Sequence, residues 1–291
     1  MPEAVPVIPP FRLHLPELLC SGVIFASPHS GRFYPPDFVA ASQLDLLRLR
    51  SSEDAFVDQL LGAVPEQGAT LIEALYPRAY VDLNRGDDEL DPALIEGLAR
   101  GSGGSRATMG LGVIPRVVAG GREIFRGRIP RTAAEGRLER IWRPYHAELQ
   151  ALMQARRAQF GRALLFDVHS MPSEATTPRS RISEIVLGDR FGTSARAETM
   201  ARAEAAFRRA GFSVARNTPF AGAYIVGRYG RPTAGLEVVQ VEISRALYMD
   251  EERVEPLPHF ELFAHLIGAV TAELADLVRL PGERAEPLAA E

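Results

Sequence analysis

The stretch Ala163–Ser170, ALLFDVHS, decides the fold class, because an apolar run here ends in residues that carry chemistry. Its apolar part, residues 163–168, is interrupted only by Asp167. A short run that is apolar on both faces is typical of a central strand covered by helices on two sides. Asp167 and His169 are two residues apart, so they point to the same side of such a strand. The stretch therefore predicts a buried strand with a carboxylate and an imidazole together near its carboxyl end.

Strands and helices alternate on both sides of this stretch. Short apolar runs and apolar–polar alternation predict further strands over residues 22–27, 69–75, 79–83, 185–187 and 236–243. Apolar residues at helical spacing predict helices over residues 54–64, 132–158, 194–210 and 259–279. This alternation favours the α/β class, with a mixed, mostly parallel central sheet flanked by helices.

The chain is expected to form a single domain over residues 21–280, since no internal repeat or linker divides it. Residues 1–20 hold five prolines and are expected to be an extended lead-in. The Pro-, Glu- and Ala-rich residues 281–291 are expected to be a flexible tail. Residues 86–122 are rich in glycine and are predicted to form a long surface excursion. Excursions of that length are often functional.

The composition argues against several classes of protein. The 33 Lys and Arg and 37 Asp and Glu give a net charge of −4, which gives no support to a nucleic-acid binder. The single cysteine, Cys20, excludes an intramolecular disulfide and a zinc finger built on thiolates. No apolar stretch approaches the roughly 20 residues of a membrane span, and residues 1–17 do not resemble a signal peptide. A cytoplasmic protein that binds neither nucleic acid nor membrane is expected, of unknown oligomeric state.

Two histidines follow predicted strands and are candidates for a metal site. His29 lies in SPHSG just past one strand, and His169 ends the central one. Ligands collect at the carboxyl ends of strands in α/β sheets, so both histidines could share one metal ion. A carboxylate beside a histidine, as Asp167 is beside His169, is the usual partner of a metal-bound imidazole. The third ligand should be a carboxylate, and the candidates are Glu53 and Asp54 at the start of a helix. The alternative is that these two acids are present only because the helix dipole favours negative charge at that end.

Two further clusters place polar side chains at strand ends. Arg78, Asn84 and Arg85 flank a short apolar run, and arginine suits bidentate contacts with carboxylates. The alternative is a solvated turn with surface arginines. Glu242 lies on an apolar strand, where burial without a partner would raise its pKa towards that of a general base. The alternative for Glu242 is a buried ion pair with Arg245.

Seven motifs that follow one another along the chain resemble those of the N-formylglutamate amidohydrolases. They are SPHSGRFYPPDF, EDAFVDQL, PRAYVDLNR, GLGVIPR, FDVHSMPS, NTPFAGAYIVGRYG and QVEISRALYMDE. That family is similar in fold to the zinc carboxypeptidases and the aspartoacylase group. The resemblance implies a zinc-carboxypeptidase-like, phosphorylase/hydrolase-like fold. It also implies hydrolysis of N-formyl-L-glutamate, a small dicarboxylate N-acyl amino acid, to formate and L-glutamate in histidine degradation.

Carried over by position, the resemblance implies one zinc ion per chain with His29, Asp54 and His169 as ligands. Carboxypeptidases place their carboxylate ligand three residues after the first histidine, a position that is Arg32 here. Asp54 in EDAFVD fits the family pattern better than Glu53. The resemblance further implies a general base, Glu242, and three ligands of the substrate carboxylates, Arg78, Asn84 and Arg85.

Other functions remain open at this point. The chain could hydrolyse another N-acyl amino acid or a peptide, or be an inactive member of the fold that binds a carboxylate. Joint retention of the metal ligands and Glu242 speaks against the inactive alternative. A serine nucleophile is not expected, because Ser30 and Ser170 each follow a histidine but neither lies in G-x-S-x-G. His146, in RPYHAEL, remains a candidate pocket residue and the next candidate for the base.

Overall fold

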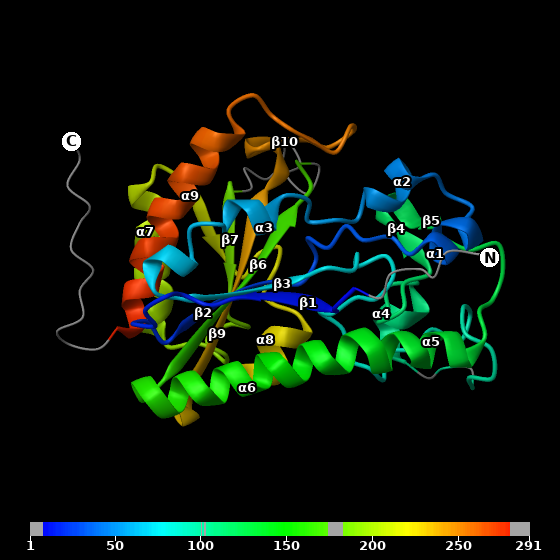
Figure 1. Cartoon of the computed structure of the whole chain (residues 1–291), viewed down its shortest axis with the longest axis horizontal. Coiled ribbons are helices and arrows are strands. Elements are labelled where there is room, and N and C mark those ends of the chain that lie inside the picture. Colours follow the sequence, from blue (N-terminus) through cyan, green and yellow to red (C-terminus); the bar gives the residue numbers. More distant parts are fainter. Residues whose placement is uncertain (1–7, 100, 102, 174–182, 280–291) are drawn as a thin grey trace.

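A seven-stranded sheet runs through the computed structural model, which describes residues 8–99, 101, 103–173 and 183–279 (Figure 1). In chain order its strands are β1 (Phe11–His14), β2 (Val23–Ser27), β3 (Thr70–Ala74), β6 (Ala163–Met171), β7 (Ile185–Gly188), β8 (Val214–Arg216) and β9 (Leu236–Ser244). Across the sheet the order is β1-β3-β2-β6-β9-β7-β8. Strands β3, β2, β6 and β9 pair in parallel, as do β7 and β8, whereas β1–β3 and β7–β9 are antiparallel. The predicted mixed, mostly parallel sheet is thus confirmed.

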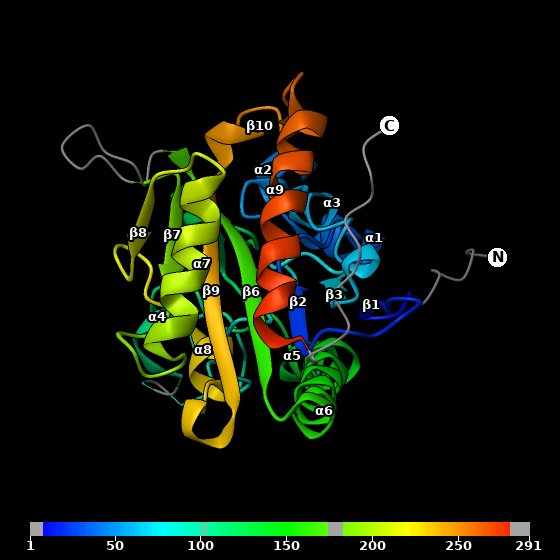
Figure 2. The same cartoon turned by 90° about the vertical axis from the view of Figure 1, so that its left-hand side faces the viewer.

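Helices cover both faces of the sheet, because its central strands are apolar on both sides. On β2, Val23 and Phe25 belong to one buried cluster and Ile24 and Ala26 to the other. The first cluster lies under three helices, α3 (Val57–Leu60), α7 (Ala197–Arg209) and α9 (Phe260–Ala275). The second lies under α6 (Arg143–Phe160) and α8 (Tyr224–Tyr229), on the opposite side (Figure 2). None of the helices among the described residues is long and apolar enough to cross a bilayer.

The predicted long helix over 132–158 is present and extends at both ends. It consists of α5 (Arg131–Arg137), a π-helical turn (Leu138–Trp142) and α6. Pro144 stands in the first turn of α6 and has no N–H to donate to the turn before it, which accounts for the wider turn at this point. The π turn matters for the site, because it carries Trp142.

Several expectations from the sequence were wrong in detail. Residues 79–83 do not form a strand: the N–H groups of Tyr80 and Val81 both donate to the Pro77 carbonyl, which makes a turn. The run is apolar because its side chains are buried, and a short buried run does not distinguish a strand from a turn. The helix expected over 54–64 is reduced to α3, because Phe56 before it has a left-handed φ of 66°.

The lead-in and the excursion are more integrated than expected. The lead-in contains β1, an edge strand that pairs with β3. The excursion over 86–122 holds α4 (Gly104–Thr108), β4 (Val117–Val118) and β5 (Arg122–Glu123), and it buries Ile95 and Ile114 completely. Residues 281–291 lie outside the described residues. The remaining α-helices and strands are α1 (Pro36–Ala41), α2 (Leu46–Arg50), β10 (Met249–Asp250) and β11 (Glu255–Pro256), and several short 3-10 helices join the elements.

Candidate active site

The register of β6 and β9 places four polar side chains on one face of the sheet. Asp167 pairs with Gln240, and His169 pairs with Glu242. Their strand neighbours, such as Val168, belong to the cluster on the other face. The polar residues occupy the carboxyl ends of both strands, where open α/β sheets bind ligands.

Three ligand atoms come together at this edge. His169 Nδ1 lies 3.0 Å from Asp54 Oδ2 and 3.1 Å from His29 Nδ1, and His29 Nδ1 lies 3.3 Å from Asp54 Oδ2. Ligands at about 2.0–2.1 Å from a tetrahedral zinc ion would be separated by about 3.3 Å. All three side chains are buried, and the triangle of their atoms fits a metal ion of that size and geometry.

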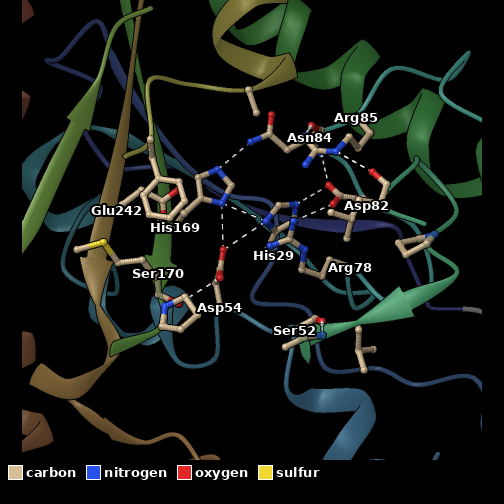
Figure 3. Close-up of a pocket in the computed structure, with 18 of the residues that line it drawn as sticks. His29, Ser52, Asp54, Arg78, Asp82, Asn84, Arg85, His169, Ser170 and Glu242 are labelled. Carbon is tan, nitrogen blue, oxygen red and sulfur yellow. Dashed lines mark hydrogen bonds and ion pairs between the residues drawn. The ribbon is translucent and has the colours of Figure 1, made fainter. Parts of the chain in front are cut away.

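Each histidine of the triangle has a carboxylate next to its outer ring nitrogen, and Figure 3 shows the one at His29, which is Asp82. His29 Nε2 lies 2.7 Å from Asp82 Oδ1, and His169 Nε2 lies 3.0 Å from Asp167 Oδ2. We assign the hydrogen of each ring to Nε2, which donates to its carboxylate. This tautomer leaves both Nδ1 lone pairs directed into the triangle, as a metal ligand requires.

Asn84 holds the carboxylate of Asp167 in position. The Ile225 N–H donates to Asn84 Oδ1 over 2.8 Å, which orients the amide. Asn84 Nδ2 then lies 3.3 Å from Asp167 Oδ2 and 3.1 Å from His169 Nε2. Because Nδ2 and the protonated Nε2 are both donors, the hydrogen bond goes to Asp167. Asn84 therefore uses both ends of its amide within the protein.

The third ligand is held by an arginine. Arg245 Nη2 donates to Asp54 Oδ1 over 3.1 Å and to the Glu53 carbonyl over 2.6 Å, while Ser170 Oγ donates to Asp54 Oδ1 over 3.1 Å. The carboxylate of Glu53 points elsewhere and accepts from Tyr34 and Arg50. Of the two acids named from the sequence, the structure thus brings Asp54 to the histidines.

The field in the triangle favours a cation. Burial alone would raise the pKa of Asp54, but in the metal-free site hydrogen bonds from His169 and His29, formed when their Nδ1 atoms carry a hydrogen, hold that pKa well below its ordinary value. Burial alone would lower the pKa of His169, but Asp167 and Asp54 outweigh it and raise that pKa well above the ordinary value. The same carboxylates that stabilise an imidazolium would stabilise a metal ion at its Nδ1.

Glu242 lies beside the triangle without a cationic partner among the described residues. Gln240 Nε2 donates to Glu242 Oε1 over 2.8 Å. Desolvation by burial is the main cause that raises the pKa of Glu242 to about 7, and His169 opposes it. The ion pair with Arg245 considered from the sequence is not formed, because Arg245 pairs with Asp54 instead. A carboxyl group with a pKa near neutrality suits a general base.

A cavity of about 640 Å³ opens onto the triangle and Glu242. This lies within the range of about 300–1,000 Å³ usual for small-molecule sites. Arg78, Arg85 and Arg106 all line it. Arg78 Nη2 donates to Asp82 Oδ2 over 2.9 Å, so Asp82 joins the first arginine to His29. The structure thus brings the two arginines named from the sequence to the same cavity as the metal triangle.

His146 does not belong to the lining of this cavity. Burial is the main cause that lowers its pKa to about 4, so its ring is neutral at pH 7. His146 Nε2 lies 2.9 Å from the Leu83 carbonyl, and its Nδ1 lies 2.9 Å from the Tyr229 hydroxyl. Trp142 Nε1 donates to the Arg85 carbonyl over 2.8 Å. Together the two rings hold the backbone on both sides of Asn84.

Reasoning from the sequence missed the part played by Asp82 and left Arg245 without a role. Asp82 lies in the PRAYVDLNR segment, between the arginines, and an acid in a run of arginines could have indicated a partner for one of them. Because residues 79–83 were expected to form a strand, the sequence did not indicate that the Asp82 side chain points at His29. Arg245 was considered only as a partner for Glu242, three residues away in the sequence.

Comparisons with known proteins cover nearly the whole chain. A family model described as N-formylglutamate amidohydrolase matches residues 21–249. The N-formylglutamate deformylase of Pseudomonas aeruginosa is 32% identical over 260 residues, which are 87% of this chain and 91% of that protein. The deformylase of Pseudomonas putida is 31% identical over 258 residues, 87% of this chain and 90% of that protein. The crystal structure of N-formylglutamate amidohydrolase from Ralstonia eutropha superposes with a TM-score of 0.87 at 35% identity, covering 93% of this chain and 99% of that one.

Proposed function

The chain belongs to the N-formylglutamate amidohydrolase family and is a hydrolase of carbon–nitrogen bonds other than peptide bonds, and we propose that its substrate is N-formyl-L-glutamate. The reaction would add water across the formamide bond and release formate and L-glutamate. We also propose that zinc is the metal and that the reaction serves histidine degradation in the cytoplasm. The named relatives support the substrate, and the donor set of two imidazoles and one carboxylate supports the metal.

One observation carries the proposal: a ligand triangle, a base and cationic side chains share one cavity. A zinc ion held by His29, Asp54 and His169 would act as a Lewis acid towards the amide carbonyl and towards water. With three protein ligands, a tetrahedral ion keeps one position open for chemistry.

The residues of the chain would then move the protons. Glu242 Oε accepts a proton from the attacking water and delivers it to the nitrogen of the leaving glutamate, which the amide needs because a free amide anion is a poor leaving group. With a pKa of about 7, Glu242 can both accept and release a proton near neutral pH. Gln240 keeps the carboxylate oriented through its hydrogen bond to Oε1.

In this proposal the arginines bind the two carboxylates of the substrate. Arg78 lies next to the metal triangle through Asp82, and its pKa is raised because Asp82 and Asp54 outweigh its burial. Arg85 donates to two backbone carbonyls, those of Leu111 and Asn84. Asn84 donates one Nδ2 hydrogen to Asp167, and because Asn84 lines the cavity its second Nδ2 hydrogen can assist the arginines at a substrate carboxylate.

Release of the free amino acid from a panel of N-acyl amino acids and a dipeptide tests the proposal. N-formyl-L-glutamate should be hydrolysed faster than N-formyl-L-glutamine, N-formyl-L-aspartate and N-acetyl-L-glutamate. Activity should disappear after treatment with a chelator and return with zinc. If N-acetyl-L-glutamate or a peptide were the faster substrate, the proposed substrate would be replaced by that one. If no member of the panel were hydrolysed by the zinc-loaded protein, the proposal would fail.

A further inference from the structure

Two arginines from different segments line the wall of the cavity. Arg85 follows the turn that carries Asp82, and Arg106 lies on α4 in the excursion over 86–122. The backbone of Leu111 joins them: its N–H donates to the Arg106 carbonyl over 2.9 Å, and its carbonyl accepts from Arg85 Nε over 3.0 Å. Both side chains line the same cavity as the metal triangle.

These two arginines differ from the other cations of the site in having no carboxylate partner. Arg78 pairs with Asp82, and Arg245 pairs with Asp54. No described carboxylate lies within ion-pair distance of the guanidinium groups of Arg85 and Arg106. The side chain of Arg106 is exposed and forms no hydrogen bond with any described residue, while Arg85 is buried and directs Nε and Nη1 at carbonyls.

Two unpaired like charges at one wall raise the free energy of the unliganded site. Burial is the main cause that lowers the pKa of Arg85; the charge of Asp82 opposes it, and the charges of Arg78 and Arg106 add to it. An anion placed between the two guanidinium groups would remove this repulsion and gain charge-assisted hydrogen bonds to both. The cavity wall formed by Arg85 and Arg106 therefore fits a carboxylate.

We infer that Arg106 is a substrate-binding residue that, together with Arg85, binds the side-chain carboxylate of the substrate. The inference rests on the proposed function, because it takes N-formyl-L-glutamate as the substrate. The α-carboxylate lies next to the amide nitrogen and must stay near the metal triangle, where Arg78 is anchored on Asp82. The side-chain carboxylate is farther along the substrate and reaches the wall that carries Arg106. Arg106 thus selects for an acidic side chain.

Steady-state kinetics with two substrates test this role. N-formyl-L-glutamine has the same α-carboxylate as N-formyl-L-glutamate and a neutral side chain of the same shape. In Arg106→Gln, kcat/KM for N-formyl-L-glutamate should fall about 10-fold, the loss of one partly exposed charge-assisted contact. The value for N-formyl-L-glutamine should stay unchanged, so that the preference between the two substrates narrows. Arg106→Lys, which keeps the charge, should restore part of the preference.

Arg126→Gln is the matched control. It removes one positive charge from an exposed position near the excursion that does not line the cavity. Arg126→Gln should keep the wild-type preference for N-formyl-L-glutamate over N-formyl-L-glutamine. This result would show that the effect of Arg106→Gln comes from a lost contact with the substrate and not from the change in net charge. If Arg106→Gln kept the wild-type preference as well, the inference would be overturned while the proposed function stood.

Binding of glutarate, a dicarboxylate that is not hydrolysed, gives a second measurement that does not depend on turnover. Calorimetric titration of the zinc-loaded protein should show weaker binding to Arg106→Gln, by about 10-fold, and unchanged binding to Arg126→Gln. If the wild type hydrolysed neither substrate and this difference remained, the proposed function would fail and the carboxylate site would stand. Equal glutarate binding by all three proteins would overturn the carboxylate site.

Discussion

Arg245 Nη2 lies 3.1 Å from Asp54 Oδ1, so the arginine that follows β9 pairs with a proposed metal ligand and not with Glu242 on the same strand. Because of this pairing, Asp54 and Glu242 differ in how readily they ionise. Asp54 is held ionised by its partners, whereas the pKa of Glu242 is raised to about 7, chiefly by burial. One acid is thereby suited to hold a cation permanently, and the other to exchange a proton.

Replacing Glu242 by Gln should remove the base and keep the site. Gln preserves the shape and can still accept from Gln240, but it takes no proton from water. Turnover should fall by about 10²–10⁴-fold, with zinc content and fold retained. In the wild type, kcat/KM should rise with pH up to the pKa of the base, and this limb should vanish in the variant. A zinc-loaded Glu242→Gln with wild-type turnover would exclude Glu242 as the base.

The same substitution should stabilise the metal-free protein at high pH. The pKa of Glu242 rises from 4.5 in the unfolded chain to about 7 in the fold, so the folded state holds its proton longer. Stability conferred by this group is present below pH 4.5 and is lost as pH rises to about 7, a change on the order of 3 kcal/mol. Chelator-treated Glu242→Gln should therefore melt above the wild type at pH 8. At pH 5 the two should melt at similar temperatures, and equal melting at both values would contradict the raised pKa.

Metal content should follow the ligand triangle. His29→Ala, His169→Ala and Asp54→Ala should each lose stoichiometric zinc and activity, because two protein ligands rarely retain the ion. Glu53→Gln is the control, since Glu53 is also buried and adjacent to Asp54 but accepts from Tyr34 and Arg50. Elemental analysis of the purified proteins provides the measurement. Loss of zinc from Glu53→Gln with retention by Asp54→Ala would show that the acid had been chosen wrongly.

Asp82→Asn should weaken metal binding without removing a ligand. The carboxylate of Asp82 fixes the ring of His29 through Nε2, and losing such a partner typically lowers metal affinity by about 10- to 100-fold. Competition with a chromogenic chelator would measure the change. Asp91→Asn is a matched control, because Asp91 is equally buried and paired with an arginine, Arg116, away from the metal triangle. Equal loss of affinity in both variants would indicate general destabilisation.

The sequence predicted the parts of the site that depend on strand periodicity. The alternation along residues 236–243 placed Gln240 and Glu242 on one face, and the run at 163–168 placed Asp167 with His169. Register, however, comes from pairing between distant segments, so the alignment of His169 with Glu242 could not be read from either strand alone. The resemblance of the motifs, not their spacing, favoured Asp54 over Glu53.

Loop contacts were beyond prediction for a related reason. Asp82 reaches His29 because residues 77–81 turn where a strand had been expected, and a buried turn is as apolar as a strand. Arg106 reaches the cavity because residues 86–122 fold back onto the core and bury Ile95 and Ile114. Such contacts depend on three-dimensional packing that no local pattern encodes.

The pairing of His169 with Glu242 also makes activity depend on the correct register of β6 and β9. Side chains alternate along β9, so a shift of one residue against β6 would turn Glu242 away from His169 and bring Val241 or Ile243 to the cavity. Such a misaligned sheet would keep most of its backbone hydrogen bonds and much of its secondary structure. The misaligned protein would nevertheless be inactive. The turnover recovered after refolding therefore measures only the molecules whose two central strands are correctly aligned.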